Sequence, residues 1–209
     1  MSQRWGVLAL VLCVGVVTMA AAQPAPTLPV TAIKAGRLID PDAGTARLDQ
    51  VILIEGERIK AVGPNLPVPP GATVIDLSKL TVLPGLVDAH THMAITYKEQ
   101  PENNYYYLTY VMESTPLRAI QAASNGIQLL DSGFTVVRDV GNNALYADAA
   151  LRQAIEQGWL PGPTVIPSGP MIGSTGGQFW PTPEMYKQHD IVFPEYIDAN
   201  SPDEIVRAV

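Results

Sequence analysis

The sequence is poor in cysteine and in charge, and each shortage excludes a class of protein. A single cysteine, Cys13, among 209 residues excludes an intrachain disulfide framework and a cysteine-rich zinc site. Only 16% of the residues are charged and 47% are hydrophobic, a balance typical of a folded domain rather than a disordered chain. The net charge of -7 argues against a nucleic-acid partner, because an acidic surface repels phosphate.

Long apolar runs are also scarce, and the main one lies at the N-terminus, where it resembles a secretory signal peptide. Arg4 supplies a positive start, residues 6–19 are almost wholly apolar, and three alanines follow as a cleavage site. The run is shorter than the roughly 20 residues of a membrane-spanning helix, although an uncleaved anchor stays the alternative. We therefore expect a signal peptide over 1–22, a Pro-rich linker over 23–29, and an exported protein, periplasmic or secreted, without stable membrane insertion. N-terminal sequencing should then find a mature chain that starts at or near Gln23.

Residues 30–83 read as short strands separated by turns. Asp40-Pro41-Asp42-Ala43-Gly44 is a strong turn signal, and a second turn lies at Glu55-Gly56-Glu57. The apolar, β-branched runs between the turns predict strands over 30–35, 50–54, 58–62 and 73–77. Their spacing predicts a small antiparallel β unit.

After residue 83 the pattern changes to strands that alternate with helices. Apolar residues recur at helical spacing over 115–132, at Leu117, Ile120, Ala123, Ile127 and Leu130. The other predicted elements are a strand over 83–92, buried in its first half, and then a strand over 134–140, a helix over 144–157 and a strand over 164–168. This βαβαβ order predicts a parallel sheet with right-handed crossovers.

The last part of the sequence combines a Pro- and Gly-rich stretch with a helix start. Residues 169–202 are expected to form a long loop, the kind of segment that is often functional. Ser201-Pro202-Asp203-Glu204 is typical of a helix N-terminus, with a serine cap, proline in the first turn and acids facing the positive end of the dipole. Because the sequence stops one turn later, at Val209, we expect it to be the N-terminal part of a longer protein.

Two of the three histidines lie at the end of the first strand of the predicted parallel sheet. Side chains alternate across a strand, so Asp88, His90 and His92 should share one face, while Thr91 points the other way and packs outward. Two imidazoles on one strand can bind one cation, with Zn–N distances near 2.0–2.1 Å. Asp88, one step deeper, would orient an imidazole or a nearby group. The spacing alone leaves a metal site and a chance pair equally open.

The segment Leu-Pro-Gly-Leu-Val-Asp-Ala-His-Thr-His at 83–92, preceded by a small β unit, resembles the amidohydrolase superfamily of metal-dependent hydrolases. Gly-Phe-Thr-Val-Val-Arg-Asp-Val-Gly at 133–141 is similar to the second-strand segment of that family. Gly162-Pro163 and the Ser-Thr-Gly-Gly at 174–177 resemble the branch of imidazolonepropionase-like and Xaa-Pro dipeptidase-like enzymes. The resemblance extends over roughly residues 31–209.

The resemblance implies an α/β fold, the N-terminal part of a (β/α)₈ TIM-like barrel over 84–209, left incomplete here, after a β-sandwich portion over 30–83. It implies one or two divalent metal ions, commonly zinc, with His90 and His92 as ligands to the more buried one. The remaining ligands and the proton-transferring aspartate would lie beyond Val209, so the 209-residue chain is expected to lack activity.

The implied reaction is hydrolysis of C–N bonds in small amides or dipeptides. A loop formed by Thr175, Gly176, Gly177 and Gln178 is the candidate substrate contact, although members of this branch often have histidine where this chain has Gln178. A deaminase of the same superfamily and a non-enzymatic, exported β-rich binding module are the alternatives. The sequence leaves open whether the protein forms a homo-oligomer.

Other polar and aromatic residues have weaker claims to a role in the site. His189 is either a third ligand or, as its polar neighbours favour, a solvated loop histidine. Arg138 and Asp139 end the second strand, where a structural ion pair or loop anchor is favoured over a catalytic role. The tyrosines at 105–107 and 110 would pack together or line a pocket.

Overall fold

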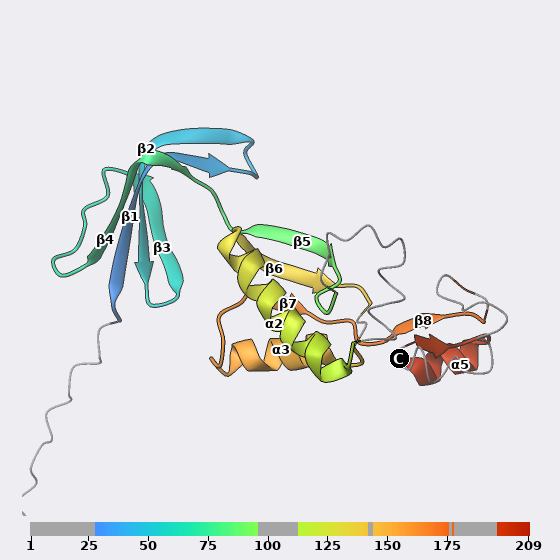
Figure 1. Ribbon diagram of the computed structural model, residues 1–209. Helices are drawn as coiled ribbons and strands as arrows, with labels where there is room; N and C mark the ends of the chain where they lie inside the picture. The colour runs from blue at the N-terminus through green and yellow to red at the C-terminus, as the bar shows by residue number, and fades with distance from the viewer. Residues whose placement is uncertain (1–27, 96–112, 142–143, 176, 178–195) are drawn as a thin grey trace, which may run out of the picture. The chain divides into compact units, whose positions relative to one another are not determined.

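The computed structural model describes residues 28–95, 113–141, 144–175, 177 and 196–209. The expected signal peptide, His189 and the four tyrosines at 105–107 and 110 lie outside the described residues. The chain divides into two compact units, Met1–Val82 and Leu83–Val209 (Figure 1). Within the described ranges, no helix has both the length and the apolar character to cross a membrane.

The first unit is a four-stranded sheet. Its strands are β1 (Val30–Asp40), β2 (Thr45–Glu55), β3 (Arg58–Pro64) and β4 (Thr73–Val82), in the order β3-β2-β1-β4. The predicted turns form two antiparallel hairpins, β1–β2 and β2–β3. The prediction of a purely antiparallel unit is wrong, because β4 pairs parallel to β1. The Pro-rich connection over 65–72 is long enough to carry the chain back across the sheet, as a parallel pair requires.

The second unit contains the predicted βαβαβ order. Strands β5 (Leu86–Thr91), β6 (Phe134–Asp139) and β7 (Thr164–Ile166) form a parallel sheet in that order (Figure 1). Helices α2 (Thr115–Asp131) and α3 (Ala147–Glu156) connect them. The parallel sheet expected from the sequence is confirmed over these three strands.

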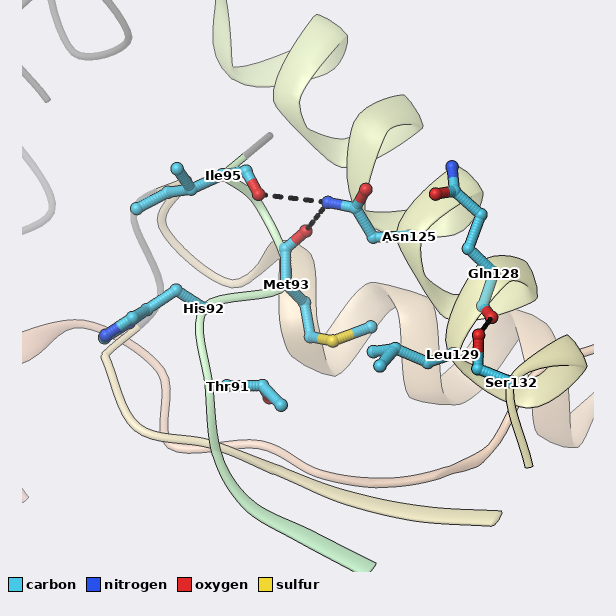
Figure 2. Close-up of a pocket in the computed structure, with 8 residues that line it drawn as sticks. All are labelled: Thr91, His92, Met93, Ile95, Asn125, Gln128, Leu129 and Ser132. Atoms are coloured by element: carbon cyan, nitrogen blue, oxygen red, sulfur yellow. Dashed lines mark hydrogen bonds between the residues drawn. The ribbon is translucent and has the colours of Figure 1, made fainter. Parts of the chain in front are cut away.

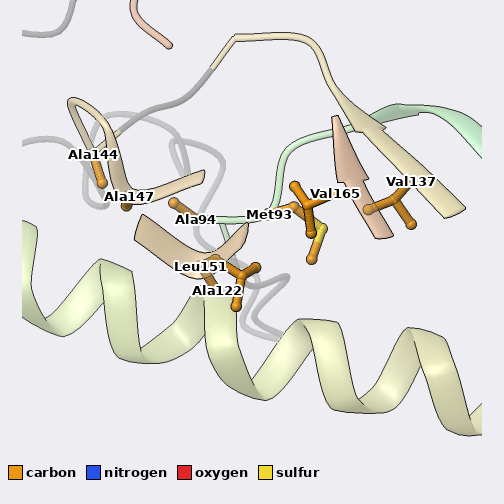
Figure 3. Packing of buried hydrophobic residues seen from close by; sticks show 8 residues of the cluster. All are labelled: Met93, Ala94, Ala122, Val137, Ala144, Ala147, Leu151 and Val165. Carbon is orange, nitrogen blue, oxygen red and sulfur yellow. The ribbon is translucent and has the colours of Figure 1, made fainter. Parts of the chain in front are cut away.

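The core of this unit lies between the sheet and its two helices (Figure 3). It contains Met93, Ala94, Ala122, Val137, Ala144, Ala147, Leu151 and Val165. Helix α2 faces this core mainly with small residues, Ala122 and Gly126, and only Ala123 of the apolar series found from its spacing packs against it. Leu117 and Ile120 of that series are exposed. A methyl group on Gly126 would already contact Leu151 and Met93, so small residues are what allow the helix to approach this closely.

The first half of β5 is exposed, contrary to the prediction from its apolar sequence. Leu86 is 40% and Val87 63% exposed. Strand β5 is an edge of the described sheet, so only β6 flanks it, and its apolar residues lack a second neighbour that would cover them.

The stretch expected as a long loop over 169–202 contains two short strands. β8 (Met171–Gly173) and β9 (Tyr196–Asp198) pair in parallel, and helix α5 (Pro202–Ala208) follows. The predicted helix start is confirmed: the Ser201 hydroxyl accepts a hydrogen bond from the backbone N–H of Glu204 at 3.3 Å. The Pro- and Gly-rich sequence around β8 and β9 gives no alternating pattern that would indicate these two strands.

Candidate metal-binding site

Strand β5 carries a bulge at the position of the histidine pair. Asp88 pairs with Val137 and Thr91 with Asp139, so β5 advances three residues while β6 advances two. Such a bulge re-aims side chains and frees backbone groups from the ladder.

Two polar side chains bind the backbone groups that the bulge frees. The Asp88 carboxylate accepts the backbone N–H of His90 at 3.0 Å. Arg138 Nε donates to the Ala89 carbonyl at 2.9 Å. Of the two roles expected for Asp88, orienting an imidazole or a nearby group, its hydrogen bond matches the second, because it holds the backbone of His90.

The two histidines come together at the carboxyl end of β5. Their ring centroids lie 5.3 Å apart, with an angle of 81° between the ring planes. His90 is exposed and His92 is half-buried, so the pair faces accessible space. The carboxyl ends of parallel strands are where α/β folds place their sites.

A hydrogen bond determines which nitrogen of His92 carries the proton. Nδ1 lies 3.2 Å from the carbonyl oxygen of Gly141, and because a carbonyl only accepts, Nδ1 must be the donor. Nε2 of the neutral ring then has a free lone pair. Metal-binding histidines are commonly held in this way, with the second ring nitrogen bonded to a carbonyl or carboxylate.

The turn after His92 is held by helix α2. Asn125 Nδ2 donates to the carbonyl oxygens of Met93, at 2.8 Å, and Ile95, at 3.1 Å (Figure 2). These residues line a cavity of about 330 Å³ between the turn and the helix, and the His92 ring points away from Asn125. The sequence does not single out Asn125, because α2 also carries other polar residues such as Gln121 and Gln128.

A second cavity, of about 430 Å³, lies at the carboxyl ends of β6 and β7. Two of the residues that line it, Ser168 and Tyr196, carry a hydroxyl group. The others are apolar: Val140, Gly141, Pro170, Met171 and Ile172. Gly141 lies between this cavity and the histidine pair. A Cβ atom added to it would lie 2.7 Å from Met171 Cγ, in the cavity wall, and 3.9 Å from His92 Cε1. Sequence analysis missed Gly141 as a site residue; a glycine two positions after a buried strand was its signal.

Arg138 and Asp139 do not pair with one another, because neighbouring strand residues point to opposite faces. Arg138 is exposed, whereas Asp139 is fully buried. The pKa of Asp139 is raised to about 7, mainly by burial and also by the nearby charge of Asp148, while the hydrogen bonds from Met93 N–H and the Thr91 hydroxyl oppose the shift.

This raised pKa makes stability depend on pH. Below pH 3.8, the ordinary value, the carboxyl is protonated in both the folded and the unfolded protein. As pH rises towards 7, only the unfolded state ionises, so the free energy of unfolding falls; the loss is complete above pH 7. At roughly 1.4 kcal/mol per pKa unit, the total loss in the free energy of unfolding is at most about 4 kcal/mol.

Asp139→Asn, which cannot titrate, should therefore lose less stability than the wild type between pH 4 and pH 8. Urea unfolding of the metal-free proteins measures this, and equal pH dependence in both would contradict it.

The candidate substrate loop is tied to the start of α5. Thr175 N–H donates to Asn200 Oδ1 at 2.9 Å, and Asn200 Nδ2 donates back to Thr175 Oγ1 at 3.0 Å. Gly177 N–H donates to the Ser174 carbonyl at 2.8 Å. Gly176 and Gln178 lie outside the described residues. The hydrogen bonds of Thr175 and Gly177 thus connect this loop to its own surroundings and not to the histidine pair.

The spacing of the two histidine rings is compatible with a shared cation. Imidazoles that bind one zinc ion at 2.0–2.1 Å with a tetrahedral angle have centroids roughly 5 Å apart, close to the 5.3 Å seen here. Within the described residues, no cluster of three or more His, Cys, Asp or Glu side chains surrounds a common point. A catalytic zinc usually takes three protein ligands and water. The described residues therefore bring together two imidazoles without a third candidate ligand beside them.

Comparison with known proteins shows the family of the chain. Residues 81–208 match the amidohydrolase family. A dihydroorotase from Geobacter sulfurreducens is 46% identical over 72 residues, which are 32% of this chain and 16% of that protein.

Two solved structures superpose on most of the chain. One is a Xaa-Pro dipeptidase with methionine bound in its active site (30% identity, TM-score 0.66), covering 86% of this chain and 43% of the dipeptidase. The other is a prolidase in complex with N-methylphosphonate-L-proline (26% identity, TM-score 0.61), covering 81% of this chain and 41% of the prolidase. The chain thus spans less than half the length of each of these relatives. Because the family match extends over more than half of its residues, the chain belongs to the amidohydrolase family.

Proposed function

We propose that the protein is a metal-dependent amidohydrolase that cleaves C–N bonds in small amides or dipeptides. The observation that carries the proposal is the histidine pair at the carboxyl end of β5, with rings 5.3 Å apart and the Nε2 lone pair of His92 left free by the bond to Gly141. The family match and the similarity to dihydroorotase and Xaa-Pro dipeptidase support the same bond class.

His90 and His92 would hold one divalent cation, for which zinc is the best candidate because it accepts two neutral imidazoles readily. When bound, the cation supplies Lewis acidity, which activates water and polarises a carbonyl at neutral pH. The protein's part is to hold the two rings: the bulge supported by Asp88 and Arg138 sets His90, and the Gly141 carbonyl sets His92. Whether one or two ions bind depends on further ligands.

The second cavity is the proposed substrate pocket. It adjoins His92 through Gly141, and its wall of Pro170, Met171 and Ile172 suits an apolar group of the substrate. A substrate seated there would place its amide beside the histidine pair.

The 209-residue chain by itself is proposed to be inactive. Its described residues offer two ligands where a catalytic zinc usually takes three. The described barrel-type sheet has three strands, and about eight are needed to close a barrel around packed side chains.

Zinc-loaded full-length protein, assayed with Xaa-Pro dipeptides and N-acyl amino acids, tests the proposal. We expect hydrolysis that stops when a chelator removes the metal and returns when zinc is added, and no hydrolysis by residues 23–209 alone. Product analysis separates the alternatives, because a deaminase releases ammonia and a binding module releases nothing. Turnover that persists without metal would contradict the proposal.

A further inference from the structure

Asp139 is a buried carboxylate for which the hydrolytic role proposed above has no use. Its side chain is fully buried. Oδ1 accepts two hydrogen bonds, whereas Oδ2 has no hydrogen-bond partner among the described residues. Burying a carboxylate without a compensating cation is costly, and an apolar residue would suit the neighbouring core. We therefore look to the hydrogen bonds of Oδ1 for the reason that a carboxylate is buried at this position.

Both donors to Asp139 stand next to His92 in the sequence. The backbone N–H of Met93, the residue after His92, donates to Oδ1 at 2.9 Å. The hydroxyl of Thr91, the residue before it, lies 3.5 Å from the same oxygen and also donates to the Arg138 carbonyl at 3.1 Å.

The residues that follow Asp139 continue this set of contacts. Val140 N–H donates to the Thr91 carbonyl at 3.0 Å, and the Gly141 carbonyl accepts Nδ1–H of His92 at 3.2 Å. Residues 91–93, which begin at the last residue of β5, are thus bound by residues 139–141, which begin at the last residue of β6. Nearly fifty positions of sequence separate the two segments, so this arrangement depends on the parallel pairing of the strands.

The Met93 bond matters because the chain turns sharply there. Ile95 N–H bonds back to the His92 carbonyl at 3.1 Å, and Met93 itself is buried. Without Asp139, the N–H of Met93 would be buried without an acceptor, which costs about 1–3 kcal/mol. The turn would shift to find another acceptor, and the His92 ring would move with it.

We infer that Asp139 is a positioning residue for His92, which it holds through the backbone of Met93 and the side chain of Thr91. The inference rests on the proposed function, since it assumes that His92 binds the metal. It assigns Asp139 no contact with metal or substrate.

The test measures zinc affinity of the full-length protein by competition with a chromophoric chelator, and thermal unfolding of the same proteins without metal. Asp139→Ala should weaken zinc binding roughly 10–100-fold, the range seen when a group that orients a metal ligand is removed. Asp139→Asn keeps the Oδ1 acceptor and should bind zinc within about threefold of the wild type. Should Asp139→Ala fail to fold, Asp139→Val removes the acceptor while filling the space with a good strand former.

Val137→Ala is the matched control. Val137 lies two residues earlier on the same face of β6, is also fully buried and shares the core with Met93, so its truncation lowers stability by removing packing but removes no hydrogen bond of the His92 turn. It should leave zinc affinity unchanged. Wild-type affinity in Asp139→Ala, equal weakening in Val137→Ala, or equal weakening in Asp139→Asn would each overturn the inference. Retention of zinc by both His90→Ala and His92→Ala would instead refute the proposed function, which separates the two failures.

Discussion

Replacing His90 or His92 by alanine is expected to remove most of the bound zinc and to lower hydrolysis by on the order of a hundredfold or more. Each substitution takes away one of the two imidazoles whose centroids lie 5.3 Å apart. A single remaining imidazole binds zinc far more weakly, because the affinity for zinc is highest where several ligands are already held in position. Metal analysis of purified full-length variants and steady-state rates measure the two effects.

The third histidine provides a control of the same residue type. His189, interpreted from its sequence context as a solvated loop residue, should keep metal content and rate when changed to alanine. Thr91→Ala is expected to lower the free energy of unfolding by about 1 kcal/mol, since its hydroxyl bonds the Arg138 carbonyl, and to weaken zinc binding only mildly, because the hydrogen bond from Met93 N–H to Asp139 stays in place. Unchanged metal stoichiometry in both His90→Ala and His92→Ala would refute their assignment as ligands.

Gly141→Ala is expected to destabilise the protein by about 2–4 kcal/mol and to weaken zinc binding at least about tenfold. Two causes add at this position. The backbone has φ of +118°, where residues with a side chain are strained. The new methyl group would also lie 2.7 Å from Met171 Cγ, so either Met171 or the glycine backbone must move. Movement of the backbone would displace the carbonyl that orients His92.

Gly158→Ala separates strain from site effects. Gly158 also has a positive φ, +72°, but nothing lies within 4 Å of the added methyl group. It should cost about 1 kcal/mol in stability, through the backbone alone, and leave zinc affinity unchanged. Urea unfolding and zinc competition on both variants make the comparison. Equal zinc affinity in Gly141→Ala and the wild type would show that the carbonyl of Gly141 does not orient the ring.

Local sequence patterns determined most helices and strands of this protein and the two histidines of its candidate site. The turn at 40–44, the cap at Ser201 and the alternation of strands with helices are local features, so the sequence shows them directly. His90 and His92 are two residues apart in the sequence, at the end of β5, so the sequence already places the two rings near one another.

Tertiary structure decided the partners of these elements. Helix α2 has two possible faces from its spacing, and only packing against Leu151 and Met93 selects the one with small residues. Strand β4 joins β1 in parallel because of where the Pro-rich connection ends in space. The bonds from Asn125, Asp139 and Gly141 to the turn at His92 join segments more than thirty residues apart. Such contacts form only when the sheet and its helices assemble, so the histidines were visible in the sequence whereas the groups that orient them were not.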